Sequence, residues 1–174
     1  GIRMAEEAGA ATGGFGAFYG HLHHRDALHN ERLWPYPHFD SIAVTSLLLG
    51  PDGRRFTDEG LGGVCLSNAL AKLDDPLSAV LVFDDAVWQG APARARPVGP
   101  NPYLQSGGGT LWSAPTLAEL ARLAGLPEEA LGESVRRHNA LATGGTLAKE
   151  DPPRSTGRVK PLSVAKAPFH AVPL

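Results

Sequence analysis

The sequence lacks the features that mark several protein classes. It has a single cysteine, Cys65, so an internal disulfide and a cysteine-based zinc site are both excluded. Its 16 basic and 18 acidic residues nearly cancel, and a formal net charge of −2 gives no positive field for nucleic acid. The apolar run from Ile42 to Leu49 is far shorter than the ~20 residues of a membrane-spanning helix. We therefore expect no nucleic-acid partner and no membrane partner.

The N-terminal end of the chain carries two further expectations. No leader with a charged region followed by an apolar region is present, so a cytoplasmic location is the default expectation. The first residue is glycine and the helical pattern has already begun there, which leads us to expect a segment of a longer polypeptide.

Glycine and proline, by contrast, are abundant. The chain has 21 glycines and 15 prolines, together about a fifth of its 174 residues. Average usage of the pair is roughly 12%. Because 43% of the residues are hydrophobic and the net charge is small, the chain can bury a core and disorder does not explain the excess. The composition predicts one loop-rich globular domain over residues 1–174.

Hydrophobic patterning in the first two thirds of the chain predicts short, mixed elements. The patterns indicate helices over 2–9 and 61–73, strands over 41–49 and 79–83, and a long loop over 90–109. A turn over 50–53 would return the chain through a short second strand at 54–56, which makes a hairpin. Cys65 falls on the predicted buried face of its helix.

The last third has the clearest helix signals. Thr116 and Glu119 form a capping box, and Gly125 ends the helix that they begin. Pro127 opens a second helix that runs to about Ala142. A brief strand is expected at 111–112 and an extended piece at 168–174. Strands and helices do not alternate strictly, so we predict an α+β fold, with a small mixed or antiparallel sheet and packed helices.

Histidines cluster between His21 and His38. Imidazole is the commonest metal ligand, so this loop could bind zinc or iron, and the chain could be an autonomous ligand- or metal-binding interaction domain. His23 and His24 are adjacent, however, and the spacing matches no metal-binding pattern that we can name. The alternatives are a solvated loop and a substrate-facing role for one or two of the histidines.

A second charged motif runs from Gly53 to Gly60 and combines two arginines with two carboxylates. Its members Arg55, Asp58 and Glu59 can fold into an ion-pair network, which is the structural interpretation. In the functional interpretation, an arginine or Glu59 faces an anionic ligand or a proton path. Local spacing does not separate the two.

The order of the motifs resembles the capping (substrate) domain of the fumarate reductase/succinate dehydrogenase flavoprotein family. The similar segments are 1–10, 53–59, 82–85, 116–139 and 167–174. The tricarballylate dehydrogenase-like branch is most similar, because Gly20-His21-Leu22 and Asp58-Glu59-Gly60 resemble its histidine loop and its acidic motif.

This resemblance implies an FAD-dependent oxidoreductase whose FAD-binding domain is largely absent from this chain. The partners would then be the FAD-binding domain of the same polypeptide and a small carboxylate-type substrate, with hydride passing between flavin N5 and a substrate carbon. The isolated chain is expected to be inactive and to hold no FAD.

The resemblance also implies roles for particular residues. His21 matches a histidine that holds a substrate carboxylate, and the neighbouring His23, His24 and Arg25 are further substrate-binding candidates. The signature residues are Arg55, Phe56, Asp58 and Glu59, and a structural role is expected for them.

One position departs from the family pattern. Fumarate reductases carry the arginine that delivers the proton four residues after the signature glutamate, and this chain has Gly63 there. No basic residue lies between Arg55 and Lys72. Fumarate reduction by that mechanism is therefore not expected. No residue is assigned as catalytic, no metal ligand is assigned, and a non-catalytic flavoprotein homologue is an alternative.

Overall fold

A computed structural model describes residues 1–94, 98–144 and 151–174 of the chain. Its four strands are β1 (Leu47–Leu49), β2 (Val80–Asp84), β3 (Trp112–Ala114) and β4 (Phe169–Pro173). They form one sheet in the order β1-β2-β4-β3, and every neighbouring pair is antiparallel. The C-terminal strand β4 lies second from the edge of the sheet, between β2 and β3. The predicted α+β class, with a small antiparallel sheet and packed helices, is confirmed.

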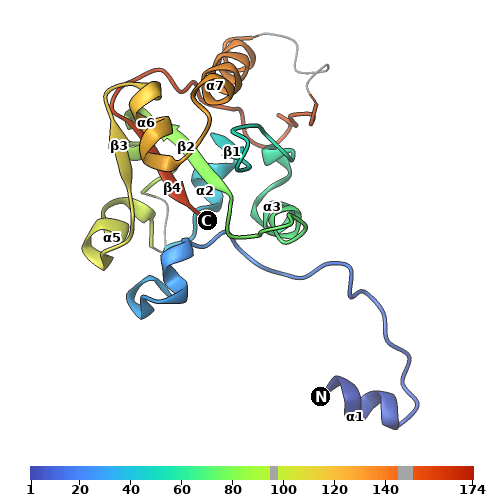
Figure 1. Ribbon diagram of the computed structural model, residues 1–174. Helices are drawn as coiled ribbons and strands as arrows, with labels where there is room; N and C mark the ends of the chain where they lie inside the picture. The colour runs from blue at the N-terminus through green and yellow to red at the C-terminus, as the bar shows by residue number, and fades with distance from the viewer. Residues whose placement is uncertain (95–97, 145–150) are drawn as a thin grey trace.

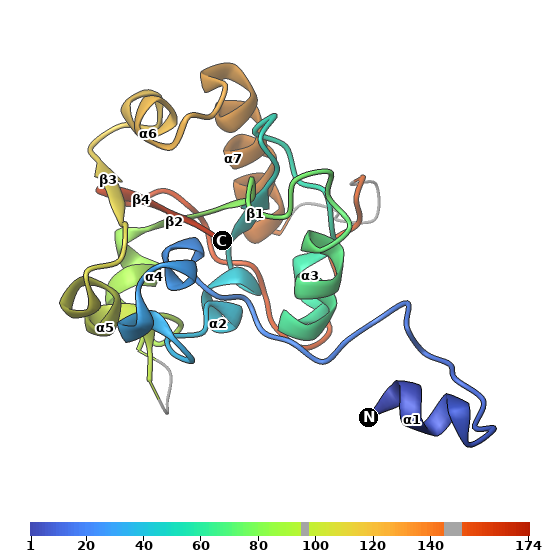
Figure 2. The ribbon, with the colours of Figure 1, turned by 60° about the horizontal axis from the view of Figure 1, so that its bottom comes forward.

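Helices cover both faces of the sheet (Figures 1 and 2). On one face lie α6 (Leu117–Ala124) and α7 (Glu128–Ala142). The other face carries α2 (Asp40–Ala43), α4 (Asp85–Gln89) and α5 (Pro100–Gly107), with α3 (Gly63–Leu70) beside them. The described residues also contain three 3-10 turns, η1 (Arg25–Leu28), η2 (Glu31–Leu33) and η3 (Glu59–Leu61).

Strand β2 shows how the sheet divides the core. Successive side chains of a strand point to opposite faces, so Val80 and Val82 face α6 and α7, whereas Leu81 and Phe83 face the other layer. All five residues of β2 are buried, as expected for the central apolar run predicted over 79–83. The apolar residues of this strand are consecutive and do not alternate with polar ones, because both of its faces are covered.

The sequence-based boundaries are wrong at two places. The segment 41–49, predicted as one strand, contains α2 followed by the short β1. Phe39 is fully buried and its carbonyl accepts from the Ala43 amide, so packing of the Phe39 side chain starts a helical turn despite the β-branched residues. The predicted loop 90–109 contains α5, which begins at Pro100 and ends at the left-handed Gly108, while residues 95–97 lie outside the described part.

The hairpin is confirmed at its turn only. The Gly53 amide donates to the Gly50 carbonyl at 3.0 Å, and the Gly50 amide donates to Arg54. The return strand reduces to one bridge between Leu49 and Arg55. In the last third, Thr116 caps α6 at the Glu119 amide, and Gly125 ends that helix with a φ of 68°.

The N-terminal segment stands apart from the rest of the domain (Figures 1 and 2). Helix α1 (Ile2–Glu7) has no buried residue, and every residue from 1 to 19 is exposed.

No helix in the described ranges is both long enough and apolar enough to cross a membrane.

Candidate functional site

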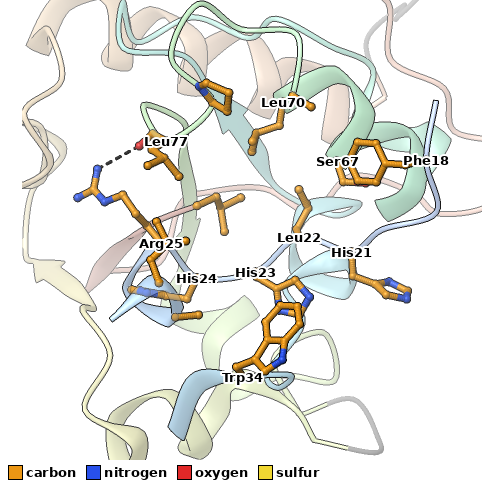
Figure 3. Close-up of a pocket in the computed structure, with 15 residues that line it drawn as sticks. Phe18, His21, Leu22, His23, His24, Arg25, Trp34, Ser67, Leu70 and Leu77 are labelled. Carbon is orange, nitrogen blue, oxygen red and sulfur yellow. Dashed lines mark hydrogen bonds between the residues drawn. The ribbon is translucent and has the colours of Figure 1, made fainter. Parts of the chain in front are cut away.

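The four predicted substrate-binding residues line one cavity of about 260 Å³ (Figure 3). His21, His23, His24 and Arg25 form one side of it, and leucines at 22, 70, 77 and 174 contribute an apolar surface. The opposite wall comes from the end of α3 and the loop before β2. The fold therefore brings the histidine loop against segments that lie about fifty residues further along the chain.

The path of the histidine loop is fixed by two anchors. Leu22 is 2% exposed and belongs to the core, and its carbonyl accepts from the Phe39 amide at 2.9 Å. His23 and His38 form an isolated antiparallel bridge. Leu22 is buried, whereas its neighbours His21 and His23 are half-buried.

His24 is fully engaged within the protein. Its ring is buried, Nδ1 accepts from the Asp26 amide at 3.0 Å, and Nε2 therefore carries the proton that it donates to the Thr110 carbonyl at 2.8 Å. Burial is the main cause that lowers the pKa of His24. Asp26 in turn accepts from the amide and hydroxyl of Thr110. His24 thus joins the loop to the segment before β3, and its substrate-binding role stays a prediction.

His21 has a carboxylate partner. Its Nδ1 lies 2.6 Å from Asp40 Oδ2, and the second carboxylate oxygen accepts from the Leu22 amide at 2.8 Å. The ring stacks on His38 with 4.3 Å between centroids, and Tyr19 meets it edge-on. In Figure 3 the ring lies at the edge of the cavity, away from Leu77. Three contacts, with Asp40, His38 and Tyr19, therefore fix the plane and position of this imidazole.

His23 lies in an aromatic cluster, and one of its ring nitrogens lacks a hydrogen-bond partner among the described residues. Its ring packs on Trp34 and on His38, both at 4.8 Å, and Figure 3 shows the Trp34 contact. Its Nδ1 is buried and has no hydrogen-bond partner among the described residues. Burial is the first cause that lowers the pKa of both His23 and His38. The neutral forms are thereby favoured at these two positions.

Arg25 connects the loop to the far wall of the cavity. Its Nη1 donates to the Leu77 carbonyl at 3.1 Å (Figure 3). The guanidinium keeps further donors that are available to a ligand. The structure thus places Arg25 at the cavity and leaves its substrate contact as a prediction.

Sequence reasoning missed Asp40 as the partner of His21. It also did not assign His38 and Trp34 to the site. The recurrence of histidine at 38 was a weak signal, but nothing in local spacing pairs it with His21. No group of three or more histidine, cysteine or carboxylate residues that could hold a metal occurs in the part of the chain that the structure describes.

The signature residues lie outside this cavity and form a buried network. Arg55 donates to both oxygens of Glu59, with the shortest contact 2.6 Å from Nη2 to Oε2. Arg154 Nη1 lies 2.8 Å from the same Oε2, and Glu59 is fully buried. Asp58 accepts from the amide and hydroxyl of Ser155. These contacts match the structural interpretation of the motif. Phe56 packs against the core.

At Cys65 the structure corrects the sequence-based expectation, and at Gly63 it adds a role that the sequence did not indicate. Cys65 is exposed, so its assignment to a buried helix face was wrong; Leu66 and Ser67 are the buried residues of α3. At Gly63, a Cβ atom would overlap the carboxylate of Asp40. The glycine therefore makes room for the side chain that holds His21.

The fold is that of a part of known oxidoreductases. The chain is similar to the open conformation of a flavocytochrome c3 fumarate reductase, with a TM-score of 0.65 and 22% identity over 99% of this chain and 27% of that one. It is also similar to a 3-ketosteroid-Δ4-(5α)-dehydrogenase from Rhodococcus jostii RHA1, with a TM-score of 0.56 and 23% identity over 77% of this chain and 26% of that one. For a 3-ketosteroid Δ1-dehydrogenase from Sterolibacterium denitrificans the TM-score is 0.51 and the identity 19%, over 78% and 28% of the two chains.

This chain thus spans about a quarter of the length of each of these structures. A scan of family models and a search of curated protein sequences found no match. At these identities the similarity establishes the fold.

Proposed function

We propose that this chain is the substrate-capping domain of an FAD-dependent oxidoreductase similar to the fumarate reductase/succinate dehydrogenase flavoproteins, with the tricarballylate dehydrogenase-like branch as the most similar. The main support for this proposal is that nearly the whole chain superposes on about a quarter of a flavocytochrome c3 fumarate reductase. In this proposal FAD supplies hydride transfer at N5 to or from a small carboxylate-type substrate. His21, His23 and Arg25 bind and orient that substrate, and the cavity walls exclude water. A cytoplasmic location remains a prediction from sequence alone.

In this proposal the residues of this chain do not by themselves hold FAD. Gly14 and Gly16 are exposed and Gly20 is half-buried, and among the described residues no strand precedes them as a dinucleotide-binding turn requires. We therefore assign FAD mainly to a second domain of the same polypeptide.

Exposed apolar side chains near the N-terminus support the proposal that a second domain covers this part of the chain. Ile2, Met4, Phe15 and Tyr19 are each more than half exposed, and helix α1 stands away from the core (Figure 1). In this proposal the FAD-binding domain covers these exposed apolar side chains.

Two measurements test the assignment. The 174-residue chain should bind no FAD, and tight stoichiometric binding would refute the division into domains. In the complete flavoprotein, His21→Ala should lower kcat/KM for the substrate by about tenfold or more, since a charge-assisted hydrogen bond contributes about 1.5–3 kcal/mol. An unchanged kcat/KM removes His21 from the site.

The cavity lining favours a second candidate substrate class. Apolar side chains dominate its walls, so an unsaturated or ketonic substrate with an apolar group fits it better than a compact dicarboxylate does. Reoxidation of the reduced flavin by short unsaturated diacids and by analogues with apolar substituents separates the two classes. Activity with neither group would favour the non-catalytic homologue, and stoichiometric zinc or iron in the purified chain would favour a metal-binding domain.

A further inference from the structure

We propose that His21 and Asp40 form a proton-transfer pair, in which Asp40 positions the imidazole and His21 Nε2 exchanges a proton with the substrate. This proposal rests on the proposed function for the substrate and for the hydride. It adds the identity of the group that donates a proton to the substrate, or accepts one from it, when the hydride is transferred.

The Asp40 carboxylate fixes which nitrogen of His21 carries the proton. One oxygen already accepts from the Leu22 amide, so the carboxylate is held in place. The other lies 2.6 Å from Nδ1 and can only accept, which places a proton on Nδ1 in both charge states of the ring. Nε2 is left as the nitrogen that gains or loses a proton.

Nε2 of His21 is also the nitrogen that is available to a ligand. It makes no hydrogen bond within the described residues, and the side chain is 30% exposed at the edge of the cavity. The titratable groups that face the ring are Tyr19, His23, His38 and Asp40. Among them Asp40 is the only carboxyl group, and its side chain contacts Nδ1 directly.

The other buried histidines of the described chain do not share this arrangement. His24 uses both nitrogens within the protein, and His138 Nε2 is engaged by the Leu162 carbonyl. His170 is 4% exposed and its Nδ1 contacts Ser113. Of these rings, only His21 combines a carboxylate on Nδ1 with an unengaged Nε2 beside the cavity.

Gly63 leaves the space in which the Asp40 carboxylate contacts His21. A side chain there would occupy the position of the Asp40 carboxylate, so the pair exists only because residue 63 has no Cβ. Asp40 begins α2 and Gly63 begins α3, two short helices that meet beside the histidine loop. The pair is therefore built from three segments that tertiary packing brings together.

The proton step balances without a further reactant. In the reducing direction, the Nε2–H bond breaks and the proton forms a bond to the substrate carbon next to the one that receives the hydride. The nitrogen regains its lone pair, and neutral His21 keeps its Nδ1–H bond to Asp40. In the oxidising direction Nε2 accepts the same proton. Both electrons travel with the hydride.

The first test requires no activity. In ¹⁵N-labelled 174-residue chain, long-range ¹H–¹⁵N spectra of the histidines should show neutral His21 as the Nδ1–H tautomer, whereas free imidazole favours the other tautomer. Asp40→Asn and Gly63→Ala should both shift His21 toward the free distribution. Gly63→Ala changes neither His21 nor Asp40 itself, but its Cβ displaces the Asp40 carboxylate from His21. Asp26→Asn, which removes a carboxylate near His24, is the matched control and should leave the His21 signals unchanged.

The second test separates proton transfer from simple binding. In the complete flavoprotein, Asp40→Asn and Gly63→Ala should lower kcat by about tenfold to a hundredfold with KM changed less than about threefold. His21→Gln should lower kcat by about a hundredfold or more.

Two results would overturn the pair. One is a His21 tautomer that does not respond to either substitution. The other is a set of variants that raise KM with kcat unchanged, which would make His21 a binding residue only and leave the proposed function intact. A complete polypeptide that binds no flavin would instead refute the proposed function, and the tautomer measurement would still decide whether the pair exists.

Discussion

The strongest stability prediction concerns Glu59, the acceptor at the centre of the buried ion network. Its carboxylate is fully buried and lies against two guanidiniums, those of Arg55 and Arg154. Its Oε1 also accepts from the Leu48 amide, so the network is joined directly to β1. Glu59→Gln keeps the shape of the side chain and removes its charge.

The magnitude follows from what the substitution leaves behind. Both guanidiniums remain buried, and the side chain of Arg154 is only 1% exposed. Burial already lowers the pKa of Arg154, and Glu59 is the first group that raises it again. Removal of one partner from a buried pair costs about 3–5 kcal/mol. For a chain of this size we therefore expect Tm to fall by about 6–20 °C.

Thermal and urea unfolding of the 174-residue chain, followed by circular dichroism, measure this loss. Glu133→Gln is the control, because Glu133 forms an exposed helical pair with Arg136 and its loss should change stability by less than about 0.5 kcal/mol. A double variant, Glu59→Gln with Arg154→Met, should be less destabilised than the two single changes together, since it removes one uncompensated charge. A Glu59→Gln protein within about 1 kcal/mol of the wild type would refute the assignment of Glu59 as the centre of the network.

Two further predictions use single positions. Gly132→Ala should stabilise the chain by about 0.5–1 kcal/mol, because this residue is inside α7 with open space at its Cβ; Gly125→Ala should destabilise it by about 1 kcal/mol, because φ is 68° there. Equal effects in urea unfolding would contradict the assigned conformations. Burial lowers the pKa of His138 below its ordinary value of about 6.5, so below that pH the unfolded chain binds more protons and stability falls with decreasing pH. His138→Gln should reduce this slope between about pH 7 and 5, and an unchanged slope would assign the effect to other histidines.

Local signals were sufficient for most of the last third of the chain. Thr116, Gly125 and Pro127 fix the ends of α6 and α7 through backbone geometry and capping, which act within a few residues. The buried strand β2 was also predictable, because both of its faces are apolar. The strand expected over 41–49 failed because burial of Phe39 outweighs the weak β preference of the residues that follow it.

The site was predictable in part. The histidine loop was identified as the substrate-binding candidate, and the structure places all four of its predicted residues on one cavity. Their separate environments were not predictable. His24 is held by Thr110 and His21 by Asp40, and in both cases the partner lies on a segment distant in sequence.

The sequence alone determined the fold class, the ends of the later helices, and the residue types from which a site could be built. These properties depend on periodicity, capping and composition, which are local. Tertiary structure decided which histidine is engaged within the protein and which is left at the cavity with a carboxylate behind it. It also gave Gly63 a physical role, because the overlap with Asp40 exists only once α2 and α3 are packed together.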